Sequence, residues 1–277
     1  MAETGRLKAP ASAGGWSALP LKRRVLLLRV AIIVTLVVVW EAVAASGLLF
    51  RDVVPSLVSV GKAMVSILTV ADHKVQLFGA EHVIPDFYRH LWVTIGEVMT
   101  GLAIGGFAGL TVGLLLGANP FLSAAFERFL YYLGPAPKII FFPLMIMWFG
   151  VGPGSKVAMG TISCFFPVVL SAASGVRQID KVLIRVGRSF RVNTWQMVTK
   201  IYLPAMRQPI INGVRLGLGV AVIGTLLAET KLSNQGIGFL IINSYTTFDM
   251  PRMYALLMLL FVVSIAANAL VGRASRA

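Results

Sequence analysis

Cysteine, histidine and acidic residues are scarce in this chain of 277 residues. Its one cysteine, Cys164, lies in an apolar run, which favours a small buried side chain and excludes an intramolecular disulfide. The three histidines, His73, His82 and His90, are eight or nine residues apart, whereas zinc ligands usually occur in tighter pairs. We therefore interpret the histidines as surface residues and predict no metal site.

Signs of catalysis are also missing. No nucleophile stands in a recognisable turn motif, and no pair of carboxylates has a spacing suited to acid–base chemistry. Residues 150–156, GVGPGSK, superficially resemble a phosphate-binding loop, but that loop has glycine directly before its lysine and Ser or Thr directly after it. Here Ser155 precedes Lys156 and Val157 follows. We therefore expect a turn rather than a nucleotide site, no cofactor in this chain, and no enzymatic activity of its own.

Charged residues make up only 13% of the chain, against roughly 25% in soluble domains. Hydrophobic residues make up 57%, and the mean hydropathy is +0.82. A helix needs about 20 apolar residues to cross the hydrocarbon core of a bilayer. The sequence therefore predicts an all-α integral membrane protein with six transmembrane helices, near residues 25–45, 91–117, 131–150, 157–175, 209–230 and 251–271.

Lysine and arginine are distributed unevenly between the loops of these spans. With the N-terminus inside, 15 of them fall on the cytoplasmic side and six on the other side. Because cytoplasmic loops are enriched in Lys and Arg, both termini are predicted to be cytoplasmic. The net charge of +14 is explained mostly by this bias and by a basic surface for a partner, with anionic membrane lipid as a further contact. We expect no nucleic-acid binding.

This topology divides the chain into three parts. Residues 1–24 are expected to form a cytoplasmic tail, residues 25–90 a first span followed by helices on the outer face, and residues 91–272 the core. The two outer helices are predicted to begin near Ser56 and near Lys74. They would cover the outer ends of the spans.

The core includes a basic segment, residues 176–207, between two spans. It carries seven Lys and Arg residues and a single acid, Asp180. Apolar residues recur at helical spacing in its first half, opposite basic ones: Ile179, Val182, Leu183, Val186 and Phe190. Asn193 and Gln196 have the spacing of a capping box for a second short helix, which we expect to stop at Pro204. Such a helix–turn–helix predicts a docking surface for a soluble partner; a helix lying on anionic lipid is the alternative.

Glycine recurs at every fourth position of the second predicted span: Gly101, Gly105, Gly109, Gly113 and Gly117. On a helix these residues form one stripe without side chains, which lets a neighbouring helix approach closely. We interpret the stripe as a packing surface within the chain, in preference to a contact between two copies.

Charged residues inside spans are costly and are therefore candidates for function. Glu97 lies about two turns into the second span from the outer side. Glu97 is a candidate for the substrate pathway, but we favour an interhelical hydrogen bond or a buried ion pair as its role. Glu229 is a second candidate, predicted to lie at the outer end of the fifth span, where water reaches it.

The end of the basic segment resembles a known loop. Membrane permease subunits of binding-protein-dependent ABC importers have a cytoplasmic loop of the form E-A-A-x3-G-x9-I-x-L-P, and Ile201, Leu203 and Pro204 match its end. Counting back places Arg185 where the motif has glutamate and Arg191 where it has glycine. Other stretches resemble the nitrate/sulfonate/taurine branch of this family: Trp40-Glu41, Pro55-Ser56, 148–152, 166–168, 175–177, 188–190, Trp195-Gln196 and Ala228-Glu229.

The resemblance implies a type I importer permease with a cytoplasmic coupling helix, in a bacterial inner membrane. Such permeases pair, usually as homodimers, and receive substrate from a periplasmic or lipid-anchored binding protein. Two cytoplasmic ATPase subunits, which hold ATP and magnesium, drive them. The coupling residues of this chain would be Asp180, Arg185, Arg188, Ser189, Phe190, Arg191, Trp195, Ile201, Leu203 and Pro204. The transported substrate stays open.

Two positions depart from the motif. Arg185 reverses the charge presented to the ATPase. Either the cognate ATPase has a compensating acidic cleft, or the turn differs, or the chain is a weakly active or differently partnered paralogue. Arg191 stands where glycine adopts a positive φ without a Cβ penalty, and arginine adopts it only at a cost. The main alternative function is a secondary transporter driven by an ion gradient, which predicts broken helices and carboxylates near the middle of the membrane.

Overall fold

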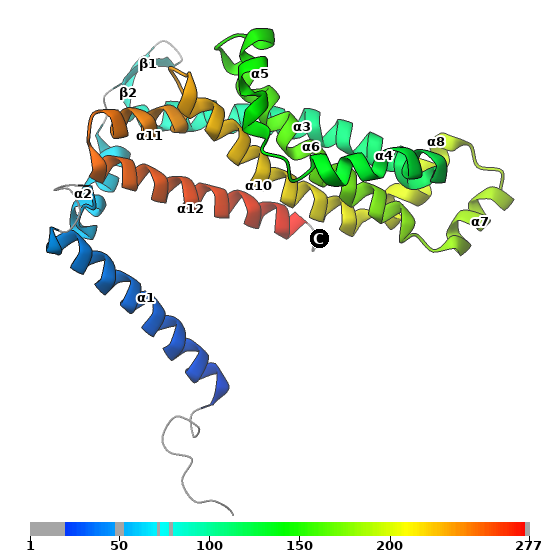
Figure 1. Ribbon diagram of the computed structural model, residues 1–277, viewed down its shortest axis with the longest axis horizontal. Helices are drawn as coiled ribbons and strands as arrows, with labels where there is room; N and C mark the ends of the chain where they lie inside the picture. Colours follow the sequence, from blue (N-terminus) through cyan, green and yellow to red (C-terminus); the bar gives the residue numbers. More distant parts are fainter. Residues whose placement is uncertain (1–19, 48–52, 71–72, 78–79, 275–277) are drawn as a thin grey trace, which may run out of the picture. The chain divides into compact units, whose positions relative to one another are not determined.

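The computed structural model describes residues 20–47, 53–70, 73–77 and 80–274, without the side chains of 73–84 and 274. Contacts divide the chain into two units that meet between Ser59 and Val60. Figure 1 labels their helices and strands. Within the described residues, five helices are long and apolar enough to cross a membrane, or six if a bent pair counts as one span.

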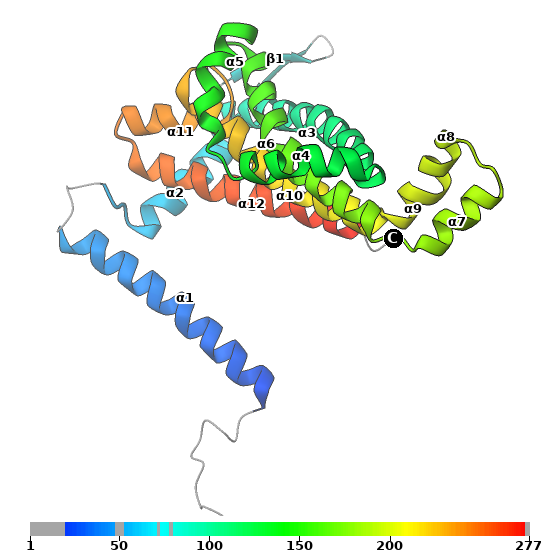
Figure 2. The same cartoon turned by 45° about the vertical axis from the view of Figure 1, so that its right-hand side comes forward.

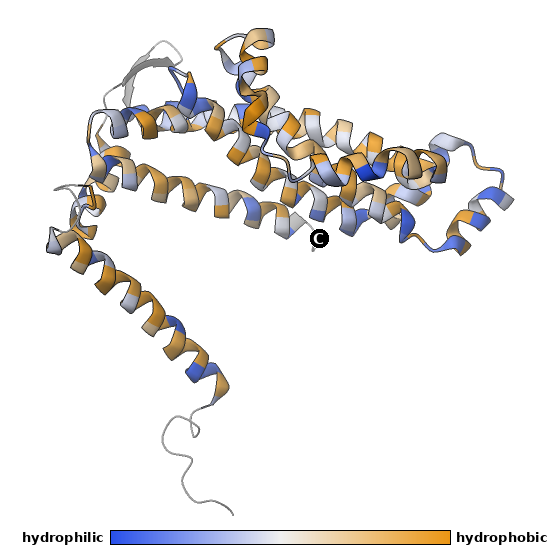
Figure 3. Ribbon diagram, in the orientation of Figure 1, coloured by the Kyte–Doolittle hydropathy of each residue, from blue (hydrophilic) through white to orange (hydrophobic). Residues whose placement is uncertain are grey.

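The first unit contains α1 (Leu21–Ser46), which is apolar along most of its length (Figure 3). None of its residues is buried by contacts within this unit. In the last two turns of α1, Trp40 Nε1 donates to Pro55 O (3.0 Å), and Glu41 Oε1 accepts from Leu57 N (2.7 Å). The two sequence stretches that carry the family resemblance in this unit therefore bond to each other.

The second unit contains the remaining four long helices. These are α3 (Asp86–Ala118), α6 (Pro153–Arg177), α10 (Arg207–Lys231) and α12 (Met250–Ala274). In Figures 1 and 2 α6 runs beside both α3 and α10. Apolar side chains from α3, α6 and α10 form a shared core around Cys164, which is fully buried.

The predicted third span, 131–150, is not one straight helix. Its residues belong to α4 (Pro120–Leu133), a 3-10 turn (Lys138–Phe141) and α5 (Phe142–Phe149), and the two halves are bent by 94°. The break falls in the sequence Gly-Pro-Ala-Pro, whose two prolines lack the N–H groups that a continuous helix needs. The other five predicted spans coincide with single long helices.

The glycine stripe of α3 faces α6. A Cβ atom added at Gly113 would lie 2.5 Å from Ala172 Cβ, and one at Gly117 would lie 2.5 Å from Val176 Cβ. The other three glycines of the stripe contact α6 in the same way. Because glycine alone leaves room for this approach, the stripe joins two helices of one chain.

Shorter elements lie between the spans. Helix α2 (Leu57–Thr69) begins just after Ser56, as predicted. The second expected outer helix, from Lys74, is wrong: β1 (His73–Leu77) and β2 (Ala80–Ile84) form an antiparallel hairpin there. The segment has β-branched residues on both sides of a glycine, a composition that favours a hairpin over a helix. Helix α11 (Ile237–Thr246) follows α10 at the same end of the unit.

The basic segment forms a hairpin that extends beyond the opposite end of the unit (Figure 2). It consists of α7 (Lys181–Ser189), α8 (Thr194–Gln196), a π-helical turn (Met197–Tyr202) and α9 (Leu203–Ala205). Hydrophilic and hydrophobic residues alternate along α7 (Figure 3). We call residues 181–205 the coupling hairpin.

Candidate functional site

The coupling hairpin is anchored at its start by local contacts. Asp180 caps α7, because its Oδ1 accepts a hydrogen bond from Val182 N (2.8 Å). The preceding Ile179 is buried with Met206 and Val176 at the end of the bundle. Asp180 therefore shapes the hairpin, which limits its availability for direct contact with a partner.

The turn after α7 has the conformation that the motif glycine would adopt. Arg191 has φ of 50°, Val192 N donates to Gly187 O (3.2 Å), and Arg191 N donates to Arg188 O (3.0 Å). This is a Schellman ending, in which glycine is the usual residue at the left-handed position. Arginine there costs about 1 kcal/mol or more, because its Cβ approaches the carbonyl oxygen.

The return arm of the hairpin begins at a capping box. Asn193 Oδ1 accepts from Gln196 N (2.7 Å), and Gln196 Oε1 accepts from Asn193 N (3.1 Å), as predicted. The return arm ends at Ala205, one residue beyond the end predicted at Pro204. Pro204 lies two residues after the π-helical turn that ends at Tyr202 and is the second residue of α9.

The two arms of the hairpin contact each other at Gly187. A Cβ atom added there would lie 2.5 Å from Ile201 Cδ1 and 3.1 Å from Met197 Cε. Ile201 and Leu203 are half-buried on the return arm. The motif residue Ile201 therefore holds the hairpin closed.

The outer surface of the hairpin is apolar and exposed. The exposed fraction is 78% for Phe190 and 74% for Trp195. Three further apolar residues of α7 are about half exposed: Val182, Leu183 and Val186. Exposed cations lie between these apolar residues: Lys181, Arg185, Arg188 and Arg191. Ser189 is exposed too, and its hydroxyl bonds to its own helix. An apolar patch ringed by charge indicates a protein interaction surface.

Arg177, at the end of α6, has a different role from the other basic residues of the segment. Its Nη2 lies 2.8 Å from Glu127 Oε1, and its Nη1 donates to Glu127 Oε2 (2.9 Å). The same carboxylate accepts from Ser123 Oγ (2.5 Å). This bidentate pair fastens α4 to α6. No sequence signal indicated it, because the partners are 50 residues apart.

At the other end of the unit, side chains of α3 and α10 cap the start of α11. His90 Nδ1 accepts from Gly236 N (2.9 Å), Thr94 Oγ1 accepts from Ile237 N (2.8 Å), and Glu229 Oε2 accepts from Gly238 N (2.6 Å). Thr94 Oγ1 also donates to Glu229 Oε1 (2.7 Å). We call His90, Thr94 and Glu229 the capping cluster.

The capping cluster corrects two expectations. Glu229 is fully buried, so water does not reach it in this structure. His90 is buried too, and its Nε2 lies 3.1 Å from Asp86 Oδ2, so it is not a surface residue. Gly236 has φ of 101°, and a Cβ atom there would collide with the Glu229 carboxylate. The negative charge at the start of α11 is favourable, because helix N-termini attract anions.

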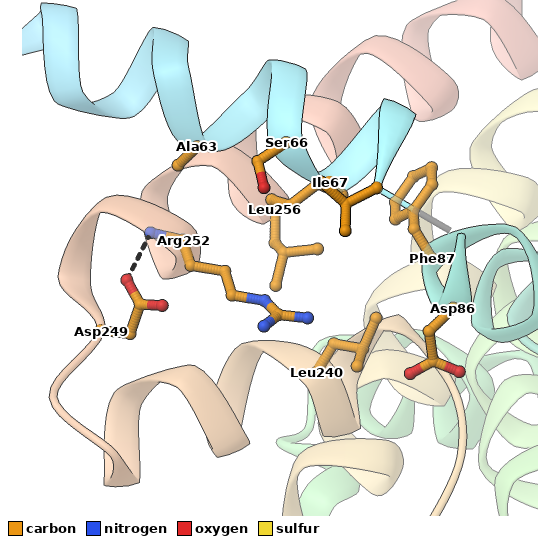
Figure 4. A pocket seen from close by; sticks show the side chains of 10 residues that line it. Ala63, Ser66, Ile67, Asp86, Phe87, Leu240, Asp249, Arg252 and Leu256 are labelled. Atoms are coloured by element: carbon orange, nitrogen blue, oxygen red, sulfur yellow. Dashed lines mark hydrogen bonds between the residues drawn. The ribbon is translucent and has the colours of Figure 1, made fainter. Parts of the chain in front are cut away.

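A pocket of about 250 Å³ lies beside the capping cluster and is shown in Figure 4. It is lined by α2, the first turn of α3, α11 and α12. Arg252 N donates to Asp249 Oδ1 (3.2 Å), while the Arg252 guanidinium is directed into the pocket (Figure 4). Asp86 lines the pocket and lies 3.1 Å from His90 of the capping cluster.

Glu97 lies one helical turn beyond Thr94 on α3 and borders a cavity of about 330 Å³. It is 6% exposed, and its Oε2 has no hydrogen-bond partner within the described residues. Lys156, 2% exposed, donates to Val151 O and to Gly152 O (3.1 Å) and interacts electrostatically with Glu97 and with Glu229. Sequence reasoning treated Lys156 only as part of a turn.

The bundle of apolar spans thus carries an exposed hairpin at one end and buried charged side chains at the other. Residues 87–277 match the family described as binding-protein-dependent transport system inner membrane component, and the chain belongs to this family. The predicted family and fold class are therefore confirmed.

The relatives are permeases. SsuC of Bacillus subtilis strain 168, provisionally described as an aliphatic sulfonates transport permease, is 27% identical over 82% of this chain and 78% of its own length. TauC of Escherichia coli K12, a taurine transport system permease, is 30% identical over 56% of each chain. A structure of the inward-facing MetNI methionine ABC transporter is similar in fold, with a TM-score of 0.62 and 20% identity, covering 69% of this chain and 94% of that chain.

Proposed function

We propose that this chain is the transmembrane subunit of an ATP-driven importer and that separate ATPase subunits drive it through the coupling hairpin. The chain itself would hold no ATP or magnesium. A second copy of the permease would complete the pathway, and a binding protein would deliver substrate at the end that carries α2, the β-hairpin and α11. The protein would lie in a bacterial inner membrane with both termini in the cytoplasm.

The exposed surface of the coupling hairpin is the observation that carries this proposal. Phe190 and Trp195 expose most of their surface although they are large and apolar. Burying a phenylalanine side chain in a partner is worth about 1.5–3 kcal/mol, so these residues would be the main source of affinity. The exposed cations Arg185 and Arg188 would meet acidic groups of the ATPase.

The structure suggests distinct roles for the predicted coupling residues. Phe190, Trp195, Arg185 and Arg188 would contact the ATPase, since their side chains are exposed. The remaining six would give the hairpin its shape or position it: Asp180, Ser189, Arg191, Ile201, Leu203 and Pro204. Transmission of force through a short, closed hairpin requires this second group to hold the first in place.

The substrate pathway would pass Glu97, which is among the residues that border a cavity. Glu229 would support the pathway indirectly, by fixing the start of α11. The relatives' descriptions cover chemically different small molecules, such as aliphatic sulfonates, taurine and bicarbonate. Import of a small polar solute is the function common to them and is what we propose for this chain.

The test is purification of the tagged full-length chain from its native membranes in mild detergent. A stoichiometric soluble subunit with a nucleotide-binding loop is the expected result. Phe190→Ala should then weaken binding of that subunit by tenfold or more, which corresponds to about 1.4 kcal/mol. Phe121→Ala is the matched control, because Phe121 is equally exposed (78%) but lies on α4. Equal loss in both variants would contradict the proposed surface.

One alternative function has structural support. A secondary transporter predicts broken helices and buried carboxylates, and the described residues contain both, in the bend between α4 and α5 and in Glu97 and Glu229. Uptake into membrane vesicles separates the two functions. The importer requires ATP and continues when an ionophore removes the ion gradient, whereas a secondary transporter stops with the ionophore and ignores ATP.

A further inference from the structure

We propose that the half of α10 next to the coupling hairpin binds a small oxoanion, such as a sulfonate or a carboxylate, through the guanidinium group of Arg215. This inference rests on the proposed transport function and adds the chemical class of the solute. Arg215 lies eight residues, or about 12 Å, from the start of α10 at Arg207. An arginine this far inside a span is costly, and such residues usually face the bundle interior or a water-filled cavity.

The guanidinium group of Arg215 is held in place by α12. Its Nε donates to Asn268 Oδ1 (3.1 Å). A Cβ atom added at Gly272 would lie 3.6 Å from the Arg215 Cζ and 3.8 Å from both Nη atoms, so the group lies against this glycine. Arg215 is exposed, and its two Nη groups make no hydrogen bond or ion pair within the described residues. Four N–H donors are therefore held in position and remain available.

Arg215 belongs to a polar stripe on α10. Exposed residues that are polar or lack a side chain recur at spacings of four, three and four: Gln208, Asn212, Arg215 and Gly219. Residues at these spacings share one face of a helix. Between Gly219 and Ala228 the exposed residues are apolar instead, Ile223 and Leu227. Snorkelling to the membrane surface would explain Arg215 alone, whereas the whole stripe indicates a water-filled space along this half of the helix.

The charges around Arg215 favour an anion. Residues 207–228 and 250–274, which cover α10 up to its last turn and the whole of α12, contain no aspartate or glutamate. The ends of these helices nearest the coupling hairpin also carry the exposed cations Arg207 and Arg273. Pairs of guanidinium N–H groups match pairs of oxygen atoms on an oxoanion. The ligand group at Arg215 is therefore an oxoanion rather than an amine.

This chemistry is offered both by a dissolved organic anion and by the phosphate of a lipid headgroup. Gly219, at the far end of the stripe, is twelve residues or about 18 Å from the start of α10. Headgroup phosphates lie at the ends of the spans, outside the hydrocarbon core. The depth of the stripe therefore favours the dissolved anion.

The experiment measures the reactivity of a thiol near Arg215 in the full-length chain, in phosphatidylcholine nanodiscs without ATP. Asn212→Cys supplies the thiol, because Asn212 is exposed one turn from Arg215, and the fully buried Cys164 is the unreactive background. Sodium methanesulfonate should slow labelling by a neutral maleimide roughly threefold or more. Dimethyl sulfone, in which a methyl group replaces the charged oxygen, should leave the rate unchanged in sodium chloride of the same ionic strength. Equal protection by both compounds, or by neither, overturns the proposal.

Substitutions at Arg215 assign the effect to its guanidinium group. Arg215→Gln should abolish the protection and leave the unprotected labelling rate as it was, because the thiol stays exposed. Arg215→Lys keeps the charge without the paired N–H groups and should retain only part of the protection, and it serves if the Gln variant does not fold. Arg128→Gln, which removes an exposed arginine on α4, is the matched control and should keep full protection. Undiminished protection in either Arg215 variant overturns the proposal.

Phosphatidylglycerol distinguishes the dissolved anion from a lipid headgroup. We expect the same unprotected labelling rate in nanodiscs with and without this lipid, and protection by methanesulfonate in both. Slower labelling in phosphatidylglycerol, together with no protection by methanesulfonate, would assign Arg215 to the lipid surface and overturn the proposal.

This test and the test of the proposed function fail separately. Loss of ATPase binding or of ATP-dependent uptake would overturn the importer and leave anion binding intact, because labelling needs neither. Conversely, ATP-dependent uptake together with absent protection by methanesulfonate would leave the importer standing and overturn only the ligand class.

Discussion

The coupling hairpin and the capping cluster are both built from polar contacts, but they differ in range. In the hairpin, Asp180 bonds to Val182 and Asn193 to Gln196, two and three residues away. In the capping cluster, Thr94 bonds to Glu229 across 135 residues. Local contacts can form wherever the segment lies, so the hairpin can project from the protein, whereas the capping cluster exists only when three helices have assembled.

The two regions also differ in how deeply their side chains are buried. The hairpin keeps Phe190 and its cations exposed, and the capping cluster buries a carboxylate completely. Exposed groups cost little free energy of folding and remain available to bind a partner. A buried carboxylate is tolerated only when donors satisfy its oxygens. We therefore expect substitutions in the capping cluster to change stability and those in the hairpin to change association.

Glu229→Ala should have the largest effect. It leaves Thr94 and the Gly238 N–H buried without their acceptor, so we expect a loss of about 3–5 kcal/mol, measured by thermal denaturation in detergent. Glu229→Gln, which keeps one acceptor oxygen, should lose less than half as much. A denaturation temperature unchanged by the alanine substitution would show that the capping cluster does not stabilise the fold.

Gly113→Ala should come next, at about 1–3 kcal/mol, because its Cβ would lie 2.5 Å from Ala172 Cβ on α6. Gly106→Ala is the matched control on the same helix, since a Cβ there meets nothing within 4 Å. That control should be neutral or slightly stabilising, because alanine favours helix more than glycine does. Similar destabilisation in both variants would argue against close packing of the stripe.

Arg185→Glu should leave the denaturation temperature unchanged and weaken binding of the ATPase subunit. Reversal of an exposed charge changes association by about 1 kcal/mol, or roughly fivefold, if it faces an acidic cleft. Titration of the purified subunit against the chain in nanodiscs, at low and high salt, measures the effect. Unchanged or tighter binding would exclude an acidic cleft opposite this residue.

Arg191→Gly should have the smallest effect and the opposite sign. Glycine relieves the positive φ at this turn, so we expect local stabilisation of a few tenths to about 1 kcal/mol. Slower hydrogen exchange of the Val192 amide, which bonds to Gly187 O, would report it. In Arg188→Gly, inside α7, exchange should instead accelerate. Acceleration in both variants would mean that arginine is not strained at this turn.

The parts of the fold that could be predicted are those that depend on neighbours in the chain. The helix start at Asn193 followed from the spacing to Gln196, and five of the six spans followed from runs of apolar residues. The hairpin from His73 and the bend after Leu133 were missed, because overall hydropathy outweighed a local glycine and two prolines. The helix expected to stop at Pro204 ends one residue later, at Ala205.

The sequence alone determined the class of this protein, the approximate positions of its spans and the coupling hairpin, since apolar length, local capping and a short motif need no distant partner. The tertiary structure decided what the charges inside the spans do. Only the approach of α3, α6 and α10 brings Glu229 to Thr94 and Lys156 close to Glu97. Burial then removes water from these groups, so they depend on one another and on backbone groups for their bonds.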